Sequence, residues 1–192
     1  MQDETKSFKV SLLPIYAAIK KTAGLIAPEL NIEGAAIAGE RLLLFNRGNN
    51  FAVVFPWQLF AAYIQKQDSA PVPEFKIVKF TLPVINNFPV GISGACALSN
   101  SEILFTASLE ETKDFIQDGT IKGSYLGLLD LLSNGEIKLM ALTPLKDDSG
   151  KILTDKLESI EVLKSDGKNT ELVAVADNDD GKSKLFYMTL KR

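Results

Sequence analysis

The sequence contains no histidine and only one cysteine in 192 residues. Ser-His-Asp and Cys-His triads need an imidazole as general base, and histidine-ligated zinc sites need it as a ligand. A single cysteine cannot form an intrachain disulfide, and Cys96 lies in the apolar run Gly-Ala-Cys-Ala-Leu, which is typical of a core residue. Any chemistry must therefore use carboxylates, lysine, hydroxyl groups or a bound metal ion.

The chain also lacks an apolar run of 18 residues, so no membrane-spanning helix is predicted. Its first residues are polar and carry no signal-peptide pattern, which favours a cytoplasmic protein. The net charge of −3 disfavours nucleic acid and anionic membranes as partners, because both select a basic surface. With 46% hydrophobic residues, the composition is that of an ordinary globular domain.

Most of the sequence consists of short apolar runs separated by Gly, Asn, Asp, Ser or Pro. This pattern is typical of strands joined by tight turns. Two segments, 14–24 and 56–66, differ because their apolar residues recur at helical spacing after a proline. The sequence therefore predicts an all-β fold with two short inserted helices.

An internal repeat organises the strands. Its matching positions are Glu33-Gly34, Ser93-Gly94 and Glu158-Ser159, and each pair is followed by an apolar strand, a turn and further strands. Repeats of roughly this length that consist of antiparallel strands indicate the blades of a β-propeller.

We expect one β-propeller-like domain, residues 1–192, with three four-stranded antiparallel blades. The predicted blades cover about 31–82, 91–144 and 157–190, and a strand at 8–13 completes the last of them. Three blades cannot close a ring, since propellers typically contain about four to eight. We therefore expect half of a six-bladed ring, completed either by a homodimer that exchanges first strands or by further blades upstream.

Several motifs resemble those of a known family. They are NIEGAAI with RLLLFNRGN, SGACAL with LFTASLEET, and KLESIEVL with VADNDDG. Together they resemble an uncharacterised family of bacterial β-propeller proteins related to the esterase-like phytase family. Members of that family look longer, so this chain is similar to their C-terminal half. The resemblance implies a propeller fold and brings no established activity.

Polar residues gather where the first strand of each blade begins and the second ends, because antiparallel strands bring these points together. The expected neighbours are Glu33 and Arg47, Ser93 and Ser108, and Glu158 and Asp177, with Glu110 following the second pair. The innermost strands of a propeller line its channel, so these residues would converge on one mouth of the channel. They are the predicted ligand-binding residues.

Carboxylates gathered without basic partners are stable only if they are solvated, protonated or bridged by a cation. Their oxygens suit calcium or another divalent cation, and the candidate ligands are Glu33, Glu158, Asp177 and Asp179. Such a mouth would bind a small, phosphorylated molecule, with Arg47 contacting the phosphate. A structural alternative stays open, in which Glu33 and Glu158 only accept backbone hydrogen bonds between blades.

Three functions follow from these residues. The first is a non-catalytic module that binds a small ligand or a divalent cation at the channel mouth. The second, suggested by the phytase-like resemblance, is a metal-assisted phosphoester or carboxylic ester hydrolase that uses metal-bound water. The third is a protein-interaction scaffold that docks a partner through the helix at 56–66.

Residues 176–183, Ala-Asp-Asn-Asp-Asp-Gly-Lys-Ser, fit the relaxed pattern of a nucleotide-binding phosphate loop. A phosphate loop leads into a helix, whereas the residues after Gly181 alternate as a strand. The aspartates would also repel a polyphosphate. We therefore predict a hairpin turn in this segment.

Overall fold

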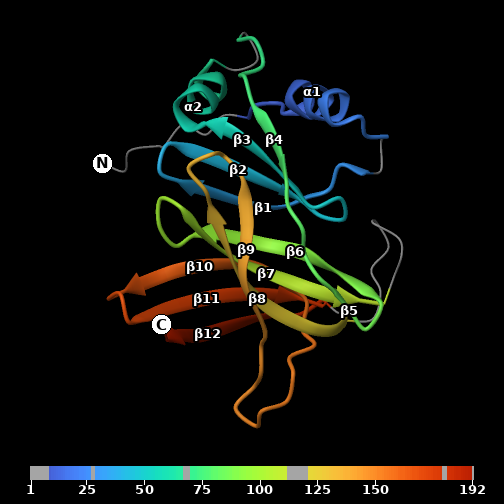
Figure 1. Ribbon diagram of the computed structural model, residues 1–192, viewed down its shortest axis with the longest axis vertical. Helices are drawn as coiled ribbons and strands as arrows, with labels where there is room; N and C mark the ends of the chain where they lie inside the picture. The colour runs from blue at the N-terminus through green and yellow to red at the C-terminus, as the bar shows by residue number, and fades with distance from the viewer. Residues whose placement is uncertain (1–8, 27–28, 67–69, 112–120, 179–180, 192) are drawn as a thin grey trace.

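The apolar runs form antiparallel strands in three sheets that stack face to face in the computed structural model (Figure 1). The structure describes residues 9–26, 29–66, 70–111, 121–178 and 181–191. Each sheet comes from one continuous stretch of chain, and its strands follow one another in sequence order. This arrangement is that of propeller blades, so the predicted all-β, propeller-like fold is confirmed, but the described sheets have four, five and three strands and not four each.

The strands of each sheet have these bounds. The first sheet contains β1 (Ile32–Ala38), β2 (Arg41–Asn46), β3 (Phe51–Pro56) and β4 (Lys76–Lys79). The second contains β5 (Val84–Ile85), β6 (Phe88–Ala97), β7 (Glu102–Glu110), β8 (Ile121–Leu131) and β9 (Ile137–Pro144). The third contains β10 (Leu157–Ser165), β11 (Asn169–Asp177) and β12 (Ser183–Lys191). The 176–183 segment thus leads into a strand and not into a helix, as predicted.

Two apolar layers hold the sheets together, and β7 contributes to both because its side chains alternate between its faces. Ile103 and Phe105 are buried between the first and second sheets, where they pack with Phe45. Leu104 is buried on the other face, where it packs with Leu172 of the third sheet. Each fully buried side chain of this size contributes about 1.5–3 kcal/mol to folding.

The two predicted helices are present as α1 (Leu13–Ala23) and α2 (Trp57–Gln65). Proline occupies the first turn of α1, and Gly24 ends that helix in a left-handed conformation with φ of 68°. Both helices cover the outer face of the first sheet (Figure 1). Ile19 of α1 and Tyr63 of α2 are almost fully buried there against the strands. Neither described helix reaches the length and apolarity that crossing a membrane requires.

The prediction of a strand at 8–13 is wrong for the residues that the structure describes. Residues 9–12 lie outside any strand, and Leu13 already begins α1. Val10 and Leu12 pack with the helices against the first sheet, far from the third. The alternating apolar residues do pack against the protein, but they pack on the first sheet and not on the third. Phe8 lies outside the described residues.

The two ends of the stack differ. The helices cover the face of the first sheet that a further blade would contact. The outer face of the third sheet instead presents apolar side chains to solvent, with Leu185 54% exposed, Tyr187 73% and Val175 36%. Completion of a ring by a second copy or by upstream blades stays a prediction, and the helical cover works against it at the first sheet.

Candidate functional site

The polar residue that opens each repeat lies at a β-bulge. Glu33, Ser93 and Glu158 are the positions where the pairing of the first strand with the second shifts by one residue. A bulge leaves its extra residue unpaired and redirects its side chain. Three bulges at equivalent positions show that the sequence repeat is also a structural repeat.

The small residue after each bulge lies where neighbouring sheets approach most closely. A Cβ atom on Gly94 would lie 2.8 Å from Ser159 Cα and 3.0 Å from the backbone oxygen of Glu158. A Cβ atom on Gly34 would lie 3.1 Å from Ala95 Cβ. Larger side chains would push the innermost strands apart, so packing between blades explains the small residue of the repeat.

Arg47 connects the first sheet to the second through two carboxylates. Its Nη1 lies 3.9 Å from Glu33 Oε1, and its Nη2 forms an ion pair with Glu110 Oε1. Asn31 Nδ2 donates to the same Glu33 oxygen at 2.9 Å. The Arg47 side chain lies against Gly91 of β6, where a Cβ atom would be 2.8 Å from Nε. The structure thus brings Glu33, Arg47 and Glu110 together in one cluster.

This cluster is mostly buried, since the Arg47 side chain is 13% exposed and that of Glu110 is 5% exposed. Removing one partner of such a pair leaves an uncompensated charge, at a cost of about 3–5 kcal/mol. The guanidinium is already matched by two carboxylates, which disfavours the binding of a phosphate group at Arg47. The cluster is therefore a buried ionic contact that joins the first sheet to the second.

The two serines of the second blade do not lie directly opposite each other. Gly91 is the residue that pairs with Ser108, while the hydroxyl of Ser93 donates to Thr106 Oγ1 at 3.3 Å. Both serines are about 1% exposed. Ser93 and Ser108 are therefore on adjacent strands but are not cross-strand partners, and neither hydroxyl is open to solvent as a nucleophile would need.

At the third blade, Glu158 lies beside Lys156 and not opposite Asp177. Lys156 Nζ is 3.2 Å from Glu158 Oε1, and the backbone N–H of Asp177 donates to the oxygen of Lys156 at 3.0 Å. Glu158 and Asp177 are therefore not directly opposed, because two bulges in β10 together shift its pairing with β11 by two residues. The charges at this predicted position are therefore matched.

A second ion pair lies beside Lys156. Asp155 accepts hydrogen bonds from Lys184 Nζ at 2.5 Å and from Asn178 Nδ2 at 2.8 Å. Partial burial acts to raise the pKa of Asp155, but these two hydrogen bonds and the charge of Lys184 hold it below its ordinary value. Asp155 is therefore ionised and paired at neutral pH.

The premise of the predicted cation site was a set of carboxylates without basic partners. In the part of the chain that the structure describes, Glu33 lies beside Arg47 and Glu158 beside Lys156. No group of three or more His, Cys, Asp or Glu side chains in the described residues is arranged to hold a metal ion. Asp179, the fourth predicted ligand, lies outside the described residues.

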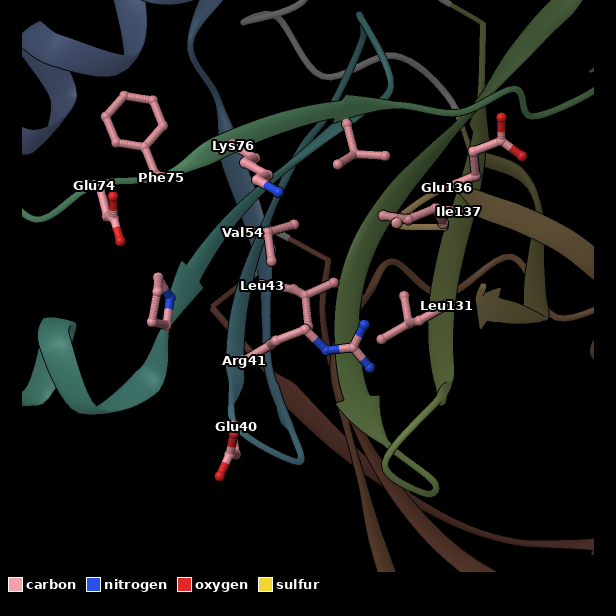
Figure 2. Close-up of a pocket in the computed structure, with 13 residues that line it drawn as sticks. Glu40, Arg41, Leu43, Val54, Glu74, Phe75, Lys76, Leu131, Glu136 and Ile137 are labelled. Carbon is pink, nitrogen blue, oxygen red and sulfur yellow. The ribbon is translucent and has the colours of Figure 1, made fainter. Parts of the chain in front are cut away.

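A groove of about 440 Å³ lies between the first and second sheets, and we call it the inter-sheet groove (Figure 2). It opens at the start of β2, whereas Arg47 follows the end of that strand. Its apolar lining residues are Leu43, Val54, Pro56, Phe75, Val78, Leu131 and Ile137. The charged lining residues are Glu40, Arg41, Glu74, Lys76 and Glu136.

Two cations lie over the apolar floor of the inter-sheet groove. In Figure 2, Leu43 and Val54 lie between Arg41 and Lys76, while Glu74 lies off to the left. Arg41 Nη2 donates to the backbone oxygen of Asn100 at 2.8 Å, which fixes the guanidinium beside the second sheet. The floor can bury an apolar group, and the two cations can pair with an acidic one.

Sequence reasoning missed the inter-sheet groove because its walls come from three separate stretches, 40–56, 74–78 and 131–137. A groove between blades depends on how two sheets pack, which no local pattern encodes. One part of the groove lining could be predicted from the sequence of β4. Lys76 and Val78 alternate with Ile77 and Lys79 on β4, and this places Lys76 and Val78 on the face that meets the second sheet.

Three stacked antiparallel sheets with tightly packed innermost strands define a propeller-like all-β protein with a groove between its blades. Comparison with family models then places residues 1–190 in a family of unknown function (DUF6929), and the chain belongs to that family. No curated protein and no solved structure matches the chain. The family match supports the expectation of an uncharacterised family and says nothing of phytases.

Proposed function

We propose that the chain is a ligand-binding module that holds a small, largely apolar molecule with an acidic group in the inter-sheet groove. The observation that carries this proposal is the groove itself, about 440 Å³ in volume, with the cations Arg41 and Lys76 on either side of an apolar floor and with Glu40, Glu74 and Glu136 also in its lining. Small-molecule sites have volumes of roughly 300–1,000 Å³ and combine mostly apolar walls with a few polar groups.

The chemistry of the walls defines the ligand class. Val54, Phe75 and Val78 are half-buried and offer an apolar contact surface above the buried Leu43. A ligand that buries about 150 Å² of apolar surface there gains about 4 kcal/mol. A contact between its acidic group and Lys76 or Arg41 adds about 1–2 kcal/mol. The total corresponds to a dissociation constant on the order of 0.1 mM.

We prefer the inter-sheet groove to the channel mouth because of the charges. At the mouth, Arg47 and Lys156 each lie against carboxylates of the protein itself. An acidic ligand would have to displace those carboxylates and leave Glu110 buried without its partner. At the groove, an acidic group can reach Lys76 from solvent, since that side chain is exposed.

The test is a fluorescence titration with 8-anilinonaphthalene-1-sulfonate, an aromatic molecule with one acidic group. Two lysines of β4 form a matched pair, because Lys76 lines the groove and Lys79 does not. Lys76→Gln should weaken binding by about three- to tenfold, and Lys79→Gln should leave it unchanged. Val78→Trp fills the groove and should abolish binding while a thermal melt shows a folded protein.

Equal binding by all of these variants would show that the dye binds elsewhere. Near-ultraviolet circular dichroism of each variant provides the control, because this dye also binds partly unfolded proteins.

The hydrolase alternative rests on the phytase-like resemblance and on calcium at Glu33 and Glu158. It is tested by assaying phosphate and carboxylic esters with added calcium. Activity that disappears in the Glu33→Gln and Glu158→Gln double variant would favour it over the binding module, and activity that persists would clear both residues of a role.

The scaffold alternative rests on α2. Trp57 and Leu59 are 36% and 45% exposed, whereas Phe60 is 9% exposed and belongs to the core. A partner would therefore contact Trp57 and Leu59 only. Loss of a captured partner from a Trp57→Ala and Leu59→Ala variant, with dye binding intact, would favour this alternative.

A further inference from the structure

Among the residues that the structure describes, the third sheet has one strand fewer on its outer side than the first sheet. In the first sheet β4 pairs with β3, and in the second sheet β9 pairs with β8. The third sheet ends at β12, which pairs with β11, and within the described residues no strand pairs with its other edge. The first and second sheets thus have a further strand, β4 and β9, at the position where the third sheet has none within the described residues.

The central part of the β12 edge lacks the usual protection against pairing, and the charged residues of the strand, Lys184 and Lys191, lie near its ends. Natural edge strands are blunted by charged residues, proline or bulges. Residues 185–190 have the sequence Leu-Phe-Tyr-Met-Thr-Leu, without a charge or a proline, and β12 pairs with β11 without a register shift. Such an edge favours the addition of another extended segment.

A groove of about 570 Å³ lies beside this edge, between the second and third sheets, and we call it the edge groove. Phe186, Met188 and Leu190 of β12 line one wall, and they are half-buried on the face that meets the second sheet. Leu126 and Leu145 line the other wall. The space exists because the sheet stops one strand before the outer edge of its neighbour.

We propose that an extended segment of a partner polypeptide, with apolar side chains at alternate positions, binds as the fourth strand of the third sheet. Its backbone pairs with the free edge of β12. Its apolar side chains enter the edge groove, since alternate residues of a strand lie on the same face. This is β-augmentation, in which the backbone supplies affinity and the pockets supply specificity.

The spacing of the wall fixes the pattern of the segment. Phe186, Met188 and Leu190 lie two residues apart, so a paired strand presents its apolar residues at positions i, i+2 and i+4. β12 has nine residues, which sets the longest segment that can pair throughout. The edge groove is separate from the inter-sheet groove, so this proposal and the proposed function fail independently.

The test measures fluorescence anisotropy of labelled peptides with the whole chain. The probes are residues 7–13 of this chain, Ser-Phe-Lys-Val-Ser-Leu-Leu, and a short designed peptide of alternating valine and threonine. Both should bind, and N-methylation of alternate backbone nitrogens, which removes the donors of the ladder, should weaken binding at least about tenfold. A peptide of the same composition with its apolar residues clustered should bind at least about tenfold more weakly.

Variants of the protein locate the site. Met188→Lys places a charge in the edge groove and should weaken peptide binding at least about tenfold, and so should Leu145→Lys on the facing wall. Leu185→Lys is the matched control, because that residue is on the same strand but 54% exposed on the other face. It should change binding by less than about twofold.

Three results would overturn the proposal. The first is that neither alternating peptide binds. The second is equal binding of the clustered or N-methylated peptides, which would mean contact with an apolar surface rather than strand addition. The third is a dimer of the chain alone that Met188→Lys dissociates, which would make a second copy the occupant in place of a separate partner.

Discussion

Substitution of Gly94 by alanine probes the closest contact between the second and third sheets. A Cβ atom there would lie 2.8 Å from Ser159 Cα, 2.8 Å from Thr106 Oγ1 and 3.0 Å from the oxygen of Glu158. Two of these neighbours are backbone atoms of β10, so the strand as a whole must move to accommodate the methyl group. Gly94→Ala should therefore destabilise the fold through the packing of its innermost strands.

The magnitude follows from two opposing effects. Overpacking in a rigid site costs about 1–3 kcal/mol, and rigid backbone neighbours put this site at the upper end. The loss of backbone freedom in the unfolded state gives back about 0.5–1 kcal/mol. The net loss is about 2 kcal/mol, which lowers the melting temperature of a chain of this size by roughly 4–8 °C.

The assay is urea and thermal unfolding of Gly94→Ala, Gly34→Ala and Gly123→Ala. For Gly34 the nearest atom is Ala95 Cβ at 3.1 Å, and for Gly123 it is Ile152 Cγ2 at 3.2 Å, the end of a flexible side chain. The expected order of destabilisation is Gly94, then Gly34, then Gly123. A Gly94→Ala protein as stable as the parent chain, within about 0.5 kcal/mol, would refute the packing of the sheets described above.

Three further predictions concern single side chains. Arg47→Met leaves Glu110 buried without its partner and should cost about 3–5 kcal/mol in urea unfolding, whereas Lys122→Met, in an exposed pair with Glu111, should cost less than about 1 kcal/mol. The folded-state pKa of Asp155 lies below its ordinary value of 3.8, so its ionised form stabilises the fold above that pH and the contribution is lost as the pH falls through the folded pKa. Asp155→Asn should therefore lower the urea midpoint at pH 7 but not at pH 2, and an equal effect at both would contradict the pairing with Lys184. Burial, and next the charge of Glu161, raise the pKa of the Cys96 thiol to about 12, so iodoacetamide at pH 8 should modify Cys96 slowly in the folded protein and rapidly in urea.

The sequence predicted those features that have a local cause. Period-two alternation marks the strands, and the proline and glycine that bracket α1 set its ends. The repeat at Glu33, Ser93 and Glu158 was recognisable because the same bulge needs the same pair of residue types in each sheet. The reason for the small residue in this repeat could not be predicted, because the close contact at Gly94 forms only when two sheets pack together.

The features that the sequence missed depend on register and on contacts between sheets. Two bulges in β10 place Lys156 instead of Glu158 beside Asp177, and in β6 Ser108 pairs with Gly91 and not with Ser93. Arg47 was predicted beside Glu33, but Lys156, the basic partner of Glu158, was missed because it precedes its strand. The segment at 9–12 has the alternation of a strand, but its apolar side chains are half-buried against the helices and the first sheet instead.

The central claim is that the inter-sheet groove is the ligand site, and amide chemical shifts of the whole chain test it most directly. Titration with 8-anilinonaphthalene-1-sulfonate should shift the amides of Val54, Val78 and Ile137, which line the groove on both sheets. Shifts confined to Arg47 and Glu110 would move the site to the channel mouth and contradict the claim, and so would the absence of any shift at saturating dye.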